Sequence, residues 1–433
     1  MKARRVIIPL ILVAMLVLPA LPSAYAWVQV ATFQVTGRVV SVDASEQYVA
    51  ILTVDEPHEE CVLYVLSLDN LSLVKQHVID DCMVMGTETN AVDVYKDVVA
   101  VIVSNVANPL STNADVYIYN VTSDTLMRVS IYNSSVLYTY DNSVAITKDF
   151  VIASVTHGDE NGETDYIYII APNGTILSQY RMGYCALVDS VDGADNMIVI
   201  DVSESGTGRE YGVVASVGRD GSLNVLYQYE SLGAEGIDAV YDPQHGVIYV
   251  AYATIDAACW DYLVIDAIDV TDTNMSWRRA LFYNFTYKLG YYLADLDLTP
   301  AGHLVVCADR YGVYRYDVSQ SYLYKENLPD NISTGTDVSS VEYVLTNDSE
   351  YVVQVDNDNG VVIVYRNLCG NIGGTTTVTQ TVTETVTQPV MQYETETETE
   401  TVTVQGPFSQ TDLALVGVLG FVLALAVAVL LRR

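Results

Sequence analysis

A short run of apolar, largely β-branched residues that ends in a polar residue recurs along this chain about every 50 residues. Its seven copies are YVAILTVD, VVAVIVSN, FVIASVTH, MIVIDVSE, VIYVAYAT, HLVVCADR and YVVQVDND, which begin at Tyr48, Val98, Phe150, Met197, Val247, His303 and Tyr351. Successive starts are 50, 52, 47, 50, 56 and 48 residues apart. Short apolar runs between turn residues are typical of buried strands, and a fixed period indicates a row of repeated units.

Each copy lies inside a larger pattern of strands and turns. A shorter strand and a turn precede it, as in LDLTPAGH, and an alternating strand such as CVLYVLSL or DVYIYNV follows it. Most units end in another turn and an outer strand, as in APNGTILSQY. Four short strands per unit, seven times, resemble a seven-bladed β-propeller of the WD40, YVTN or quinoprotein-like kind. A pair of β-sandwiches is the alternative fold, and the regular period argues against it.

The two ends of the repeat region complement each other. The last unit, Val338–Arg366, has only three strands, whereas the segment WVQVATFQVT at Trp27 is a strand without a unit. We predict that this N-terminal strand completes the last blade. Such closure removes an open sheet edge that would otherwise favour aggregation.

The chain ends predict secretion and anchoring. Basic residues, an apolar stretch and the small-x-small sequence Ala24–Ala26 indicate a signal peptide over 1–26, with an uncleaved first helix as the alternative. The uncharged run Leu413–Leu431 precedes two arginines and is long enough to span a bilayer. Between them we expect a β-propeller over 27–374, a disordered Thr/Glu-rich stalk over 375–411 and a transmembrane anchor over 412–433. This arrangement predicts a type I membrane protein at the cell surface, with its C-terminal arginines in the cytoplasm.

Charge limits the partners of the expected propeller. The segment 27–374 has 48 acidic and 15 basic residues. Nucleic acid is excluded, because phosphate binding requires clustered cations. Metal cations, basic proteins and neutral glycans remain, as does the simpler reading that the charge only keeps the protein soluble. Together with 33 tyrosines and a Thr-rich tail, this composition resembles surface proteins of hyperthermophilic archaea.

All six cysteines lie in the expected propeller, and an even number is compatible with disulfides outside the cytoplasm. Cys61 and Cys82 flank the outer strand of one blade and are predicted to pair. Cys259 and Cys307 belong to adjacent blades and are a second candidate pair. Cys185 and Cys369 would remain, although the fold places them on opposite faces.

Eight N-x-S/T sequons are candidate N-glycosylation sites. In a propeller the turns between third and outer strands lie on the bottom face, opposite the loops between blades. Five sequons are expected on the bottom, and Asn133, Asn284 and Asn331 on the top. The five are Asn70, Asn120, Asn173, Asn274 and Asn347.

Polar residues recur eight or nine positions before the following strand in six of the seven units. They are Asn90, Asp141 or Asn142, Asp189, Asp238, Asp295 and Glu342, whereas the first unit has Val39 or Val40 there. First strands line the channel of a propeller, so we predict a ligand site at Asp141, Asp189, Asp238, Asp295 and Glu342. The last four are candidate ligands for a hard cation, and Ca²⁺ is the candidate cofactor.

Two other interpretations of these acids stay open. Like charges at close range raise the pKa of one carboxyl, as a glycosidase-like hydrolase would require. Alternatively, the acids are solvated in a water-filled channel and bind nothing. The sequence contains no H-E-x-x-H or G-x-S-x-G motif, and no catalytic residue is predicted. We therefore expect an extracellular, membrane-anchored module that binds a protein or a glycan through an acidic top face, with a hydrolase and a structural envelope component as alternatives.

Overall fold

The computed structural model describes most of the repeat region and two short segments of the tail. The described residues are 27–55, 60–80, 82–83, 90–108, 111–134, 142–159, 162–182, 184–203, 210–231, 237–255, 261–270, 274–280, 293–299, 301–308, 312–319, 321–326, 338–346, 349–356, 360–367, 376–384 and 396–404. Contacts divide the chain into a large unit, Ala31–Thr346 with Glu350–Tyr365, and a small unit, Met1–Val30, Asn347–Ser349 and Arg366–Arg433. Each unit is described by itself.

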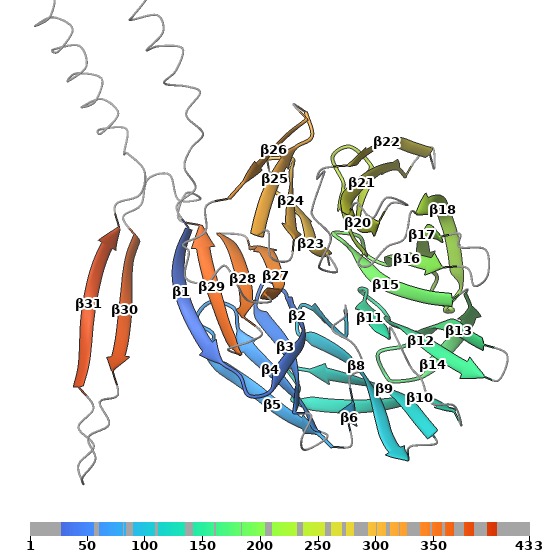
Figure 1. The fold of residues 1–433 in the computed structure, drawn as a ribbon, viewed down its shortest axis with the longest axis horizontal. Coiled ribbons are helices and arrows are strands. Elements are labelled where there is room, and N and C mark those ends of the chain that lie inside the picture. Colours follow the sequence, from blue (N-terminus) through green and yellow to red (C-terminus); the bar gives the residue numbers. More distant parts are fainter. Residues whose placement is uncertain are drawn as a thin grey trace, which may run out of the picture. The chain divides into compact units, whose positions relative to one another are not determined.

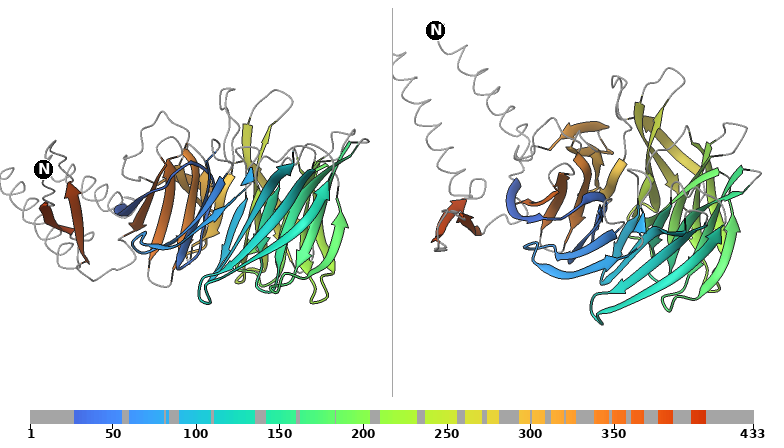
Figure 2. Two further views of the ribbon diagram at one scale, coloured as in Figure 1. Left: turned by 90° about the horizontal axis from the view of Figure 1, so that it is seen from below. Right: turned by 60° about the horizontal axis from the view of Figure 1, so that its bottom comes forward.

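The large unit is an all-β propeller, in which successive sheets surround a common hub and pack face to face (Figures 1 and 2). Five sheets are separate. The first consists of β2 (Arg38–Ala44), β3 (Tyr48–Asp55), β4 (Glu60–Ser67) and β5 (Leu73–Ile79), and the second of β6 (Cys82–Met83), β7 (Val92–Tyr95), β8 (Val98–Asn108), β9 (Ser111–Asn120) and β10 (Thr125–Ser134). The third consists of β11 (Ser143–Ile146), β12 (Val151–Asp159), β13 (Gly162–Ile170) and β14 (Ile176–Arg181). The fourth consists of β23 (Leu293–Leu298), β24 (His303–Ala308), β25 (Gly312–Asp317) and β26 (Tyr322–Lys325). The fifth has the order β1-β29-β28-β27, from β1 (Trp27–Gln34), β27 (Val338–Leu345), β28 (Glu350–Asp356) and β29 (Val361–Asn367).

Eight further strands form a single sheet, so the prediction of seven separate blades is not confirmed. The strands are β15 (Tyr184–Asp192), β16 (Met197–Ser203), β17 (Glu210–Val217), β18 (Leu223–Ser231), β19 (Ile237–Asp242), β20 (Val247–Ile255), β21 (Asp261–Asp269) and β22 (Asn274–Ala280). Each half is an antiparallel meander of four strands. The halves are joined where β15 and β19 run parallel and pair Val191 with Ala239 and Asp192 with Val240. Sequence periodicity defines strands, but it does not reveal whether two first strands approach closely enough at the hub to form a ladder.

The N-terminal strand closes the last sheet, as predicted. β1 is the outer strand beside β29, and the Val35 N–H donates to the carbonyl of Gly360 at 2.9 Å. Gly37 then turns the chain from this sheet into β2 with a φ of 84°. A Cβ atom at Gly37 would lie 2.7 Å from the carbonyl oxygen of Val54, so only glycine fits this turn.

The core lies between neighbouring sheets. Six of the eight residues of β3 and of β4 are buried, because adjacent sheets cover both faces, whereas β5 at the rim is mostly exposed. One apolar cluster includes Leu52 on β3, Ile102 on β8 and Ala153 on β12, so it runs through three successive sheets. A second joins Ala251 on β20 to Leu304 on β24. The seven-copy apolar pattern thus corresponds to strands buried on both faces.

Turns at one end of the propeller are joined by backbone hydrogen bonds. Leu68, before the β4–β5 turn, donates to Gln47 in the β2–β3 turn at 2.9 Å. Val121 likewise donates to Asp97, at 2.8 Å, in the next sheet. The first and third turns of a sheet therefore share one face, which we call the bottom face. The second strand of each sheet therefore ends, and the third begins, at the opposite end of the propeller, which we call the top face.

The predicted Cys61–Cys82 disulfide is confirmed. It joins β4 of the first sheet to β6, which pairs with β8 of the next sheet. The prediction that Cys307 pairs with Cys259 is not confirmed, because Cys307 is a free, fully buried thiol on β24. Its register partners are Asp295 on β23 and Val313 on β25. Cys259 and Cys369 lie outside the described residues, as does the side chain of Cys185.

In the small unit, β30 (Thr376–Glu384) and β31 (Glu396–Val404) form a two-stranded antiparallel sheet. Both ranges lie in the segment expected to form the stalk (375–411), and its role as a stalk stays a prediction. Frequent β-branched residues favour extended strands, and the two strands pair from Thr376 with Val404 to Glu384 with Glu396. Among the residues that the structure describes, no helix is long and apolar enough to cross a membrane. The predicted signal peptide (1–26) and anchor (412–433) lie outside the described residues.

Replacing both Cys61 and Cys82 by alanine should reduce the free energy of unfolding by about 3 kcal/mol, because the bridge closes a loop over a sequence separation of 21. Denaturant unfolding of the full chain under non-reducing conditions measures this change. A Cys307→Ala variant controls for cysteine removal as such. Equal stability of the double variant and the parent would contradict a disulfide that constrains the unfolded chain.

Candidate functional site at the hub

Four of the five predicted ligand-site acids are described, and the structure brings them together. Asp189, Asp238, Asp295 and Glu342 lie on the hub strands β15, β19, β23 and β27. They are close enough to raise one another's pKa. The Asn90 amide reaches across the hub and donates to Asp189 Oδ2 at 2.7 Å. Asp141 lies outside the described residues, and its neighbour Asn142 donates to Ser104 instead.

The sequence pattern missed four further hub acids, which are Asp43, Asp93, Asp192 and Asp297. The count back of eight or nine residues from the second strand reached only one position on each first strand. Asp43, Asp93 and Asp192 lie five residues before the second strand of their sheet, and Asp297 lies six residues before it. Testing every acid on each first strand would have found all four.

The hub carboxylates bind the backbone of the next sheet. Asp43 Oδ2 accepts the Val94 N–H, and Asp93 Oδ2 accepts the Ile146 N–H, each at 2.5 Å. On the other side of the ring the same contact recurs at 2.5 Å, from Leu296 N–H to Asp238 and from Tyr343 N–H to Asp295. In four places, therefore, an acid on one first strand satisfies an amide on the neighbouring first strand. These amides are inside the protein and would otherwise lack a partner.

Hydroxyl groups replace the acid where the third sheet meets β15. Ser143 Oγ accepts the Val188 N–H at 2.8 Å, and Ser154 Oγ donates to the Ala186 carbonyl at 2.5 Å. The fully buried Asp165 accepts the Ala186 N–H. The junction is the same in kind, since side-chain oxygens of one sheet again bind the first strand of the next.

The predicted cation site at Asp189, Asp238, Asp295 and Glu342 stays a prediction. Within the described part of the chain, which includes Asp189, Asp238, Asp295 and Glu342, no three His, Cys, Asp or Glu side chains are arranged to hold a metal ion. The oxygens of these acids have partners inside the fold. Asp238, for example, accepts the N–H of Ala239 through Oδ1 and that of Leu296 through Oδ2.

Burial and mutual repulsion make these acids hard to ionise. Burial raises the pKa of Asp93 to about 6, against the hydrogen bonds from Ile146 and Val94. Burial and the charge of Asp297 raise the pKa of Asp295 to about 7. Burial, followed by the charges of nearby hub acids, also raises the pKa of Asp238 and Glu342. The Asp192 side chain is exposed, so solvent screens its charge.

Some of these acids lie close enough to influence one another. Burial and then the charge of Asp93 raise the pKa of Asp43, and burial and the charges of Asp189 and Asp295 raise the pKa of Asp238. Like charges at close range disfavour ionisation of both members of such a pair.

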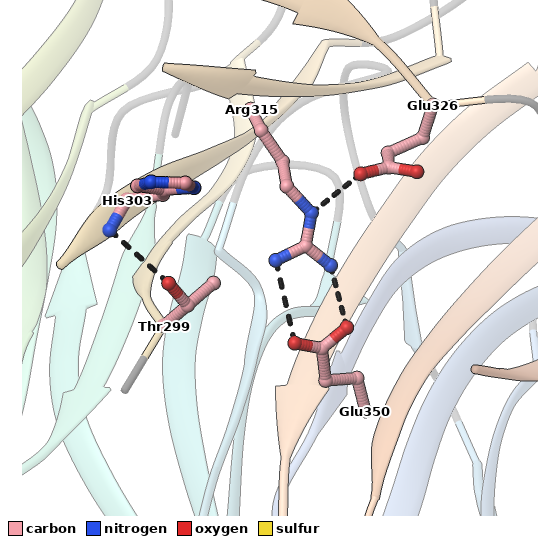
Figure 3. A network of polar contacts seen from close by, with 5 residues as sticks. All are labelled: Thr299, His303, Arg315, Glu326 and Glu350. Carbon is pink, nitrogen blue, oxygen red and sulfur yellow. Dashed lines mark hydrogen bonds and ion pairs between the residues drawn. The ribbon is translucent and has the colours of Figure 1, made fainter. Parts of the chain in front are cut away.

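A buried ion pair joins two other sheets. The Arg315 side chain on β25, 1% exposed, donates through Nε to Glu326 at 2.5 Å and through Nη2 to Glu350 on β28 at 2.5 Å (Figure 3). Its guanidinium also lies 5.8 Å from the ring centroid of Tyr343. Because Arg315 is matched by two acids and largely sealed from water, it has no open donor for an anionic ligand. It fixes the sheet of β25 against that of β28.

Comparisons with known proteins support the fold and leave the family open. No protein-family model matches the sequence, and no curated protein is similar to it. Among solved structures, hydrazine synthase from Kuenenia stuttgartiensis aligns with a TM-score of 0.51 at 12% identity, over 78% of this chain and 97% of that one. An acylaminoacyl peptidase from Pyrococcus horikoshii aligns at 0.45 and 10% identity, over 82% of this chain and 56% of that one. The β-propeller domain of the trilobed protease from Pyrococcus furiosus aligns at 0.43 and 6% identity, over 77% and 94%. Similarity at this level concerns the fold alone.

The raised pKa values of the hub acids predict that the free energy of unfolding increases as the pH falls. Asp93 and Asp295 have ordinary pKa values of 3.8 but titrate at about 6 and about 7 in the folded protein. The folded state therefore binds protons that the unfolded chain has released, so this stability is complete below pH 3.8 and is lost as pH rises through 6 to 7. The thermal unfolding midpoint of the full chain should rise from about pH 8 to about pH 5. A midpoint that falls over this range would contradict protonated hub acids.

Substitution of Asp295 separates its charge from its role as an acceptor. Asp295→Ala leaves the buried Tyr343 N–H without a partner and should cost about 1–3 kcal/mol. Asp295→Asn keeps an acceptor oxygen and removes the charge, so it should cost less at about pH 8 and flatten the pH dependence. Asp195→Ala, which breaks an exposed ion pair with Lys148, is the control and should change stability by less than about 0.5 kcal/mol. Equal losses for Asp295→Ala and Asp295→Asn would argue against the backbone contact.

Proposed function

We propose that this protein is a membrane-anchored cell-surface module that binds an extracellular protein or glycan through the loops on its top face. The observation that carries the proposal is the use of the hub acids. Their oxygens accept backbone amides of the next sheet, so the hub holds the ring together. The large acidic surplus outside the hub is then available for recognition by the loops. A basic or uncharged partner fits this charge, and nucleic acid does not.

The proposed location has two supports. The Cys61–Cys82 disulfide is typical of an oxidising compartment outside the cytoplasm. The sequence adds a signal peptide over 1–26 and an apolar run over 413–431 that is long enough for an anchor. In this proposal the Thr/Glu-rich segment between the propeller and the anchor is a spacer that holds the binding face away from the membrane.

The proposed ring has seven modules. The eight-stranded sheet consists of two four-stranded meanders, each with the same strand order as a separate sheet. They meet over only two residue pairs, β15 with β19, at the hub. We count each meander as one blade, which agrees with the seven copies of the apolar repeat. The seven interblade positions then give seven neighbouring sets of top loops as the binding surface.

An extracellular hydrolase is the second candidate, because the hub contains acids that stay protonated near neutral pH. Burial and the charge of Asp192 raise the pKa of Asp297 to about 8. A protonated carboxyl near an ionised one is the arrangement that general acid catalysis requires. Hydrolysis of a glycan by the purified chain that is lost in Asp297→Asn, while folding is retained, would favour this candidate over a binding module.

Binding should depend on the acidic loop between β3 and β4. The double variant Glu56→Gln, Glu59→Gln removes two charges from this loop and should weaken binding to a panel of cationic proteins and glycans by about tenfold at low salt. Glu46→Gln, in the exposed β2–β3 turn of the bottom face, is the matched control and should leave binding unchanged. Equal effects of the loop variant and of Glu46→Gln would show that the partner does not bind at the β3–β4 loop. If no protein or glycan of the panel bound, the proposal of a binding module for cationic or neutral partners would lose its support.

A further inference from the structure

Three sequons have described side chains, and the structure separates them into two kinds. Asn70 lies in the turn between β4 and β5, Asn173 in the turn between β13 and β14, and Asn120 at the end of β9. Asn70 and Asn173 are exposed, whereas Asn120 is half-buried. All three belong to turns on the bottom face, each of which leads from a third strand to an outer strand.

The first two sequons adopt the same local structure. Asn70 Oδ1 accepts the N–H of Ser72 at 2.8 Å, and Asn173 Oδ1 accepts that of Thr175 at 3.1 Å. In both cases the donor is the hydroxyl residue of the sequon itself. The middle residue has a positive φ, 51° at Leu71 and 82° at Gly174, which turns the chain sharply outward. Neither asparagine uses its amide nitrogen in a hydrogen bond within the described part of the chain.

Asn120 differs at each of these points. Its Oδ1 accepts the N–H of Ser123, one residue beyond the sequon, at 2.7 Å. Its Nδ2 donates to Asp97 Oδ2 in the adjoining turn at 3.4 Å. The nitrogen that would have to react is thus engaged, and its side chain is partly covered. Asn120 is therefore an internal control for Asn70 and Asn173, because its amide nitrogen is not open to a glycosylating enzyme.

A second observation also concerns these two turns. Among the described residues, the exposed large apolar side chains are Leu73, Val74, Val78, Leu126, Ile176, Leu177 and Val225. Four of the seven follow Asn70 or Asn173 within four residues, at the starts of β5 and β14. Exposed apolar residues at the rim of a sheet favour aggregation unless something covers them. A bulky, soluble group on the adjacent asparagine would do so.

We propose that Asn70 and Asn173 carry N-linked glycans that cover the apolar starts of β5 and β14, and that Asn120 stays unmodified. The inference rests on the proposed extracellular location. In the reaction, Asn Nδ2 attacks the anomeric carbon of a phosphate-activated glycosyl donor, which a transferase supplies. The new C–N bond replaces the C–O bond to the phosphate, the phosphate leaves with the electron pair, and the transferase base takes the amide proton. Since this face carries the glycans, a macromolecular partner would bind at the opposite face.

Glycopeptide mass spectrometry of the full chain from the cells that produce it tests the proposal. The variants Ser72→Ala and Thr175→Ala destroy a sequon but keep the backbone N–H that binds the asparagine, so the turn is preserved. Each should lower the mass of the protein by one glycan, and the matched control Thr122→Ala should leave it unchanged. Occupancy of Asn120 equal to that of Asn70 and Asn173, or unmodified Asn70 and Asn173, would overturn the proposal.

The covering role has its own measurement. The double variant Ser72→Ala, Thr175→Ala should self-associate at lower concentration than the parent, and adding Leu73→Thr and Leu177→Thr should restore the parent behaviour. An unchanged tendency to associate would overturn the covering role.

Labelling of intact cells with a membrane-impermeant amine reagent reports the location separately. A labelled chain without glycans contradicts this inference alone, whereas an unlabelled chain contradicts the proposed function as well.

Discussion

The propeller depends on a side-chain oxygen of one sheet that accepts a backbone N–H of the next. The first strand of each sheet faces a narrow hub. Its backbone amides on the hub side have no further strand with which to pair. Asp43, Asp93, Asp238 and Asp295 satisfy four such amides, and Ser143 satisfies another. Each contact fixes the position of one sheet relative to its neighbour. Apolar packing between sheets supplies most of the free energy, but it is non-directional and does not by itself set the angle between blades.

This arrangement explains why a highly acidic chain places acids where their charge is most costly. Aspartate reaches a backbone amide at the distance between two first strands, and its pKa rises when it is buried. The raised pKa values of Asp93 and Asp295 lower the charge that these acids carry near neutral pH. Arg315 serves the same purpose differently, since a fully buried base binds acids from two positions. Both solutions make the hub rigid and leave few oxygens for chemistry.

Sequence alone predicted the strands, the propeller fold, the closure by the N-terminal segment and the Cys61–Cys82 disulfide. These depend on local pattern and on connectivity, which are readable in one dimension. It also found acids that converge at the hub. It did not reveal their role, because a carboxylate that binds a metal and one that binds a neighbouring amide have the same sequence signature. The free thiol of Cys307 and the ladder between β15 and β19 depend on distances between blades, which periodicity does not contain.

The two faces of the ring therefore differ in what they leave free. On the bottom face, short turns bind one another within each sheet, as Leu68 does to Gln47, and between sheets, as the Ser45 hydroxyl does to the Lys96 carbonyl. Such a face has few unsatisfied backbone groups with which to recognise a partner. The hub contacts join first strands to one another. In the proposed function, recognition therefore falls to the loops between second and third strands, whose acidity would reflect the partner, whereas the acidity of the hub reflects the fold.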